Sequence, residues 1–241
     1  MIDSTAINTV LRYKFDSGFS IHGGARAQEI GGNIVAAPGL LVADSDYDFG
    51  YLVGAAYERP DIALRVALTY NSEIDNVLSR SENGVAIADF TLTTPASWNL
   101  EFQTGVAEDT LVFGSIRYAE WDGFNLTANT KEYANFEGNT TSYSVGVGRH
   151  LNDSFSVFAT LGYEAAGTSP STTALAPTTG YHIIGLGGTY TVDKMEITGG
   201  VTYVIPGDQL VNVGASTPPG TQFAFDDNSV IGVGLRVGYN F

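Results

Sequence analysis

The carboxyl-terminal stretch of the chain alternates strictly between two kinds of side chain. From Ile231 to Phe241, every odd position is apolar or aromatic, and every even position is Gly, Arg or Asn. Successive side chains of a β-strand point to opposite faces, so one face of this strand is apolar along its whole length. In a soluble sandwich that face would point into the core, whereas in a membrane barrel it would point out to lipid. The pattern of the remaining strands and connections distinguishes between these two interpretations.

The same alternation predicts eleven strands along the chain, joined by two kinds of connection. Five connections are tight turns, and five are polar loops at about 36–46, 72–84, 127–137, 166–179 and 206–227. Tight turns at one end and long loops at the other are typical of outer-membrane barrels, and a soluble sandwich has no reason to segregate them. We therefore predict an all-β fold, an antiparallel transmembrane β-barrel in which residues 1–241 form a single domain. The predicted turns are Asp16-Ser17, Pro60-Asp61, Glu108-Asp109, Asn152-Asp153 and Asp193-Lys194.

Composition narrows the class of protein further. The net charge is −15, from 11 Lys and Arg against 26 Asp and Glu, which argues against a nucleic-acid partner because phosphate contacts need a basic face. The acidity has two interpretations: general solubility, or loop carboxylates that hold divalent cations near anionic lipid head groups. Since the chain has no Cys, disulfides and thiol chemistry are excluded. No run approaches about 18 consecutive apolar residues, so no transmembrane helix is predicted.

Catalytic and metal-binding patterns are missing from the sequence. The three histidines, His22, His150 and His182, share neither a strand nor a metal-ligand spacing, and no Gly-x-Ser-x-Gly element occurs. The alternate carboxylates of the segment 44–48 lack the glycine turn and distal Glu of a calcium loop, so we interpret them as a solvated loop face. We therefore expect no enzyme activity, no cofactor and no metal.

Three stretches of the chain, taken in order, resemble the FadL-type family of outer-membrane long-chain fatty acid and hydrocarbon transporters. The stretch 55–74 ends in a Tyr-x-Ser-x-Ile element, in which Asn71 stands where a basic residue is common. The stretch 90–98 leads through Pro95 into a strand, and the stretch 116–124 ends a strand with Tyr-x-x-Trp-x-x-Phe. With the terminal Tyr239-Asn-Phe241, the resemblance covers about residue 45 to the end.

The resemblance implies a parent barrel of fourteen strands whose lumen is plugged by an N-terminal hatch. The eleven predicted strands match about the last eleven of these, and the hatch has no counterpart in the sequence. Single-chain bacterial barrels have an even number of strands. An odd number leaves a strand edge unpaired in lipid. We therefore expect the chain to be N-terminally incomplete.

The resemblance also implies a function in the bacterial outer membrane. It implies diffusion of long-chain fatty acids or other hydrophobic small molecules through the barrel, without energy or cofactor. Expected partners are that ligand, outer-membrane lipid and lipopolysaccharide, and the barrel-assembly machinery, which would recognise the strand ending at Phe241. Two alternatives remain open: a general polar porin, and a structural or adhesive barrel.

Candidate binding residues follow from the strand alternation. Arg65 and Arg117 lie in strand registers opposite the apolar positions, and a charge at the centre of the lipid face costs about 2–4 kcal/mol, so we expect both to face the lumen. One interpretation is a salt-bridge network that only holds the barrel together. The other is that these arginines attract a substrate carboxylate while the acyl chain lies on apolar groups supplied by Phe102 and Phe113. The predicted substrate-binding residues are therefore Arg65, Arg117, Phe102 and Phe113.

Overall fold

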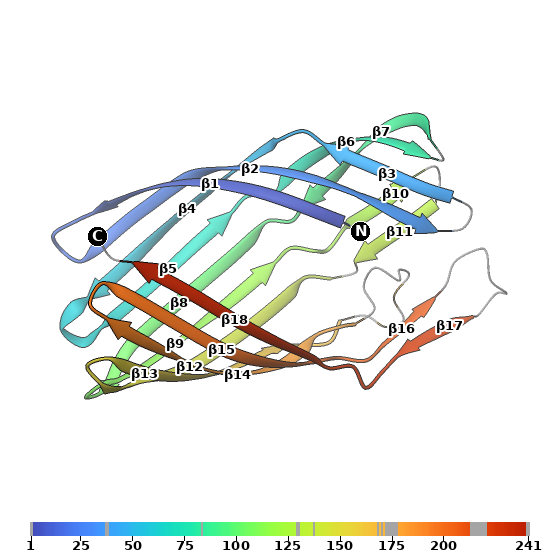
Figure 1. Cartoon of the computed structure of the whole chain (residues 1–241). Coiled ribbons are helices and arrows are strands. Elements are labelled where there is room, and N and C mark those ends of the chain that lie inside the picture. Colours follow the sequence, from blue (N-terminus) through green and yellow to red (C-terminus); the bar gives the residue numbers. More distant parts are fainter. Residues whose placement is uncertain are drawn as a thin grey trace.

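The chain folds as one large antiparallel sheet that curls around its own axis (Figure 1). The computed structural model describes residues 2–36, 39–82, 84–128, 131–136, 138–167, 169, 171, 178–212 and 221–239. The fourteen segments of the large sheet are β1 (Ile2–Lys14), β2 (Phe19–Ala36), β3 (Gly39–Ser45), β4 (Asp48–Arg59), β5 (Leu64–Asn71), β6 (Ile74–Glu82), β7 (Val85–Thr94), β8 (Ser97–Ala107), β9 (Thr110–Ala119), β12 (Thr140–Asn152), β13 (Phe155–Glu164), β14 (Tyr181–Val192), β15 (Met195–Pro206) and β18 (Val230–Tyr239).

Two small hairpins lie outside the large sheet, at the end where the long connections are. They are formed by β10 (Phe124–Ala128) with β11 (Lys131–Phe136), and by β16 (Gln209–Asn212) with β17 (Gln222–Phe225). A short 3₁₀ helix, η1 (Pro60–Ile62), makes the turn between β4 and β5. No helix in the part of the chain that the structure describes is long and apolar enough to cross a membrane.

The large sheet is eleven strands wide. Three pairs of segments lie end to end: β3 with β4, β6 with β5, and β7 with β8. The segments β3 and β4 pair with successive parts of β2. On their other side β3 pairs with β6 and β4 with β5, and these in turn pair with β7 and β8. The order across the sheet is β1, β2, β4, β5, β8, β9, β12, β13, β14, β15 and β18. The predicted all-β antiparallel fold is confirmed. Between the described residues of β1 and β18, no register joins the two edges of the sheet.

All five predicted tight turns lie where the sequence placed them, at one end of the sheet (Figure 1). The predicted loops were wrong in part, because β3 lies within 36–46 and the whole of β6 lies within 72–84. With β7 and the end of β2, these segments form a hydrogen-bonded extension of the wall at the long-loop end. The break predicted at Pro95 is confirmed, since β7 ends at Thr94 and β8 begins at Ser97.

The extension has a small apolar core of its own. Ile30, Ala43 and Leu78 are buried together, and the side chains of Phe90 and Leu92 pack against them. The extension meets the wall at three breaks that lie in neighbouring strands, at residues 46–47, 72–73 and 95–96. The extension is thus a packed part of the sheet that continues the wall beyond these breaks.

The outer face of the wall is apolar and solvent-accessible, as the alternation in the sequence predicted. In β18 the side chains of Val233 and Leu235 are 80% and 76% exposed, and β1, β4, β13, β14 and β15 carry similar rows. Apolar side chains that are buried in the described residues are few and mostly small. A soluble protein does not expose so much contiguous apolar surface, so this face is built to meet lipid. Phe241 and Asn240 lie outside the described residues.

Candidate functional site

The inner face of the wall is polar, and its registers bring distant residues into one row. Successive partners across eight neighbouring strand pairs carry this row from Glu58 and Arg65 through Phe113 to a part of the wall made of Gly and Thr. The complete row is Glu58, Arg65, Gln103, Phe113, Gly146, Thr160, Gly185, Thr202 and Gly232. Along this row, charged and aromatic side chains therefore lie at one end and small side chains at the other.

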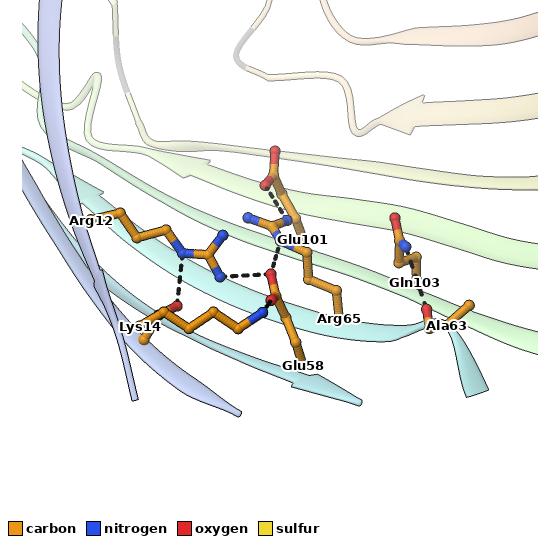
Figure 2. A network of polar contacts seen from close by, with 8 residues as sticks. Arg12, Lys14, Glu58, Ala63, Arg65, Glu101 and Gln103 are labelled. Atoms are coloured by element: carbon orange, nitrogen blue, oxygen red, sulfur yellow. Dashed lines mark hydrogen bonds and ion pairs between the residues drawn. The ribbon is translucent and has the colours of Figure 1, made fainter. Parts of the chain in front are cut away.

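Five charged side chains form a network at the charged end of this row, which Figure 2 shows from close by. Both oxygens of Glu58 are engaged: Arg12 Nη2 lies 2.6 Å from Oε1, and Lys14 Nζ lies 2.8 Å from Oε2. Arg65 contributes longer contacts, with Nε 3.5 Å from Glu58 Oε1 and Nη1 3.4 Å from Glu101 Oε2. The network crosses from β1 to β8 and joins strands far apart in the sequence.

A hollow in the inner face lies beside this network. Its larger part has a volume of about 880 Å³ and lies beside the tight turns. Leu111, Phe113 and Phe158 form an apolar floor, and Asp61, Asp109 and His150 also line it. A smaller part of about 300 Å³ lies against Arg65, Glu101, Ser115 and Ser144. Gln103 and Phe113 line both parts, so the two are adjacent. Pockets of about 300–1,000 Å³ with apolar walls and a few polar groups are typical of small-molecule sites.

Two aromatic rings give the floor of the hollow its shape. The Phe113 ring lies over Gly146 of the neighbouring strand, and the Phe158 ring lies over Gly187 in the same way. Only a residue without a side chain leaves room for such rings to lie flat on the sheet. The glycines therefore fix the positions of the two rings.

The four predicted binding residues do not all lie together. Arg65 and Phe113 line the hollow, as expected for lumen-facing residues. Arg117 also faces inward and donates a hydrogen bond to Asn99 Oδ1 at 3.4 Å, but it lies farther along β9 than the residues of the hollow. Phe102 is also among the residues around the smaller part of the hollow, but its ring lies on the other face of the sheet.

Phe102 lies on the outer face of the sheet. It pairs with Val66 and Gly114, and its ring lies against Gly114. On that side its neighbours include Val66 and Ile116, which are exposed to the surroundings of the wall. The cause is a change of alternation at Pro95: even-numbered residues such as Phe90 face inward before the break, whereas odd-numbered ones such as Glu101 face inward after it.

Sequence reasoning missed Arg12, Lys14, Glu58 and Phe158. Each one directly follows an apolar outward residue, so the period of two already placed it on the inner face. What the sequence could not show is which of these residues meet, because Arg12 and Glu58 are 46 positions apart. Within the described residues, no group of three or more His, Asp or Glu side chains is arranged to hold a metal ion.

The sheet has an apolar outer face, a polar inner face and its tight turns at one end. These features are typical of the wall of an outer-membrane β-barrel. A family model described as outer membrane protein transport protein (OMPP1/FadL/TodX) matches residues 40–241. The chain belongs to this family. It is therefore an outer-membrane β-barrel protein of a transport family and not an enzyme, as the sequence predicted. Comparison with curated proteins finds no match.

Solved structures support the same fold. A FadL homologue of Pseudomonas aeruginosa is 14% identical with a TM-score of 0.68, and the match covers 88% of this chain and 62% of that one. The monoaromatic hydrocarbon channel CymD is 13% identical with a TM-score of 0.63, covering 100% and 74%. The toluene transporter TodX of Pseudomonas putida is 14% identical with a TM-score of 0.56, covering 84% and 64%. The chain thus spans less than two thirds of the length of two of these three proteins.

Proposed function

We propose that this protein is an outer-membrane channel through which hydrophobic small molecules, long-chain fatty acids among them, diffuse without energy or cofactor. The observation that carries the proposal is the hollow of the inner face, whose apolar floor at Phe113 and Phe158 lies next to a polar part at Arg65. Membership of a transport family supports it. A hollow of this kind suits a solute with a long apolar portion, because burial of that portion supplies most of the binding free energy.

The polar part of the hollow favours a substrate that carries a carboxylate. Arg65 would bind that group in the hollow, while Arg117, for which the described residues show no ion pair, would attract it on the way along the inner face. A guanidinium binds a carboxylate through two parallel hydrogen bonds, which gives direction as well as strength. A neutral hydrocarbon would use only the apolar floor.

As further partners we propose outer-membrane lipid and lipopolysaccharide, and the barrel-assembly machinery. The exposed apolar row of β18, which includes Val233 and Leu235, supports contact with lipid. The alternation that continues to Phe241 in the sequence supports recognition during assembly.

The proposed channel can be tested by reconstituting the protein in lipid vesicles and measuring uptake of labelled palmitate and toluene. Thr160 lines the hollow, so Thr160→Trp should slow uptake strongly by filling it. Thr202 lies in the same row of the inner face but does not line the hollow, so Thr202→Trp is the matched control and should leave uptake nearly unchanged. Ion conductance without hydrophobic uptake would indicate a polar porin instead. Neither activity would indicate a structural or adhesive barrel.

A further inference from the structure

The two carboxylates of the charged network are held very differently. Glu58 is only 16% exposed and receives short contacts from Arg12 and Lys14, which engage both of its oxygens. Glu101 is 59% exposed, and among the described residues it has a single ion pair, the contact of 3.4 Å with Arg65. Glu58 is therefore a fixed part of the wall, whereas Glu101 is held by one weak, exposed interaction.

Glu101 also lies where a bound carboxylate would lie. It lines the smaller part of the hollow together with Arg65 and Phe113, next to the apolar floor. Arg65 is the one cation of the network that reaches both acids, and both of its contacts are long. Its guanidinium therefore keeps binding capacity on the side that faces the hollow.

We propose that Glu101 is an internal competitor for the ligand, occupying Arg65 in the empty channel and giving way when a hydrophobic anion enters the hollow. This inference rests on the proposed function and names the residue that sets its specificity. An anionic solute has to displace the Glu101 carboxylate, whereas a neutral solute of the same length does not. Glu101 thus lowers the affinity for anions selectively and makes their release easier.

The size of the effect follows from the weakness of the pair. Exposed ion pairs contribute little, so removing the competitor should raise anion affinity by about two- to five-fold. If the general field on the inner face were the cause instead, loss of any negative charge there would favour anions equally. Glu164 provides the control for that field effect, because it lies on the inner face with Ser142 as its hydrogen-bond donor and does not line the hollow.

The test compares two ligands of equal chain length, dodecanoate and dodecanol, binding at equilibrium to the full chain in lipid nanodiscs. Glu101→Gln should raise dodecanoate affinity about two- to five-fold and leave dodecanol affinity unchanged, and Glu101→Ser should do the same. Glu164→Gln should change neither. In an Arg65→Gln background, Glu101→Gln should have no further effect, because the competition requires Arg65.

Several results would overturn the inference. An equal gain for dodecanol would show a change of shape, and an equal gain in Glu164→Gln would show a general field effect. A gain that persists without Arg65 would show that Glu101 acts elsewhere. If the unaltered protein binds both ligands and Glu101→Gln changes neither affinity, this inference fails while the proposed function stands. If it binds neither ligand, both fail.

Discussion

The ring of Phe113 lies so close over Gly146 that a Cβ atom added to the glycine would be 2.5 Å from Cζ of the ring. The two residues are direct partners in the register of β9 and β12. The ring forms part of the floor of the hollow on the inner face. One methyl group on the neighbouring strand is therefore enough to displace a wall of the candidate binding site.

We expect Gly146→Ala to weaken hydrophobic ligand binding and to lower stability by about 1–3 kcal/mol, the usual cost of overpacking. Gly232 lies in the same row of the inner face, and an added Cβ there would meet its nearest atom, Cβ of Thr202, only at 4.0 Å. Gly232→Ala is therefore the control and should change neither property. Binding of dodecanol and thermal unfolding in detergent would measure both effects; equal behaviour of the two variants would contradict the assigned role of Gly146.

The outward position of Phe102 predicts opposite outcomes for two neighbouring residues. Phe102→Arg places a charge on the lipid face, which should cost about 2–4 kcal/mol and reduce the amount of folded protein in the membrane. Gln103→Arg places the same charge on the inner face and should be tolerated. The folded fraction is measurable by heat-dependent electrophoretic mobility. Tolerance of Phe102→Arg together with loss of folding in Gln103→Arg would reverse the assignment of the faces.

Glu58 should contribute more to the thermal stability of the protein than an ordinary surface carboxylate does. Glu58→Gln removes the charge that holds Arg12, Lys14 and Arg65 together, and like charges are then left side by side. The thermal midpoint should fall. Asp61→Asn is the control, since its ion pair with Arg59 joins two side chains that are 51% and 60% exposed. That pair should contribute almost nothing. An equal fall in both variants would show that the network is no stronger than a surface pair.

Asn76 should hold the extension together. Its side chain is fully buried, and the two hydrogens of Nδ2 are shared among Ile74 O, Leu92 O and Thr94 Oγ1, which lie at 3.0–3.1 Å. Asn76→Asp replaces the donor with an acceptor, so the buried acceptors lose their partner at about 1–3 kcal/mol each. Proteolysis and hydrogen exchange of residues 74–94 should then become faster. Asn139→Asp is a control at an exposed hydrogen bond; no difference between the two variants would show that Asn76 is dispensable.

The wall could be predicted from the sequence because the lipid imposes a strict period of two on every strand. Runs such as 231–241 and the five turns are therefore visible without a structure. The extension was not predicted, because Asn76 and Arg80 lie on its inner face among apolar residues and interrupt the alternation. The expectation that Phe102 faces the lumen did not allow for the break at Pro95, which exchanges the two faces. The charged network could not be read from the sequence, because it depends on pairings such as that of Arg12 with Glu58.

The three breaks at residues 46–47, 72–73 and 95–96 affect which insertions and deletions the chain can accept during evolution. Each break resets which residues face inward, so the alternation of the extension is independent of that of the wall beneath it. A residue gained or lost in the hairpin of β6 and β7 therefore need not invert any side chain below the break. The extension can therefore change in sequence and length, while the transmembrane part and its hollow keep their register.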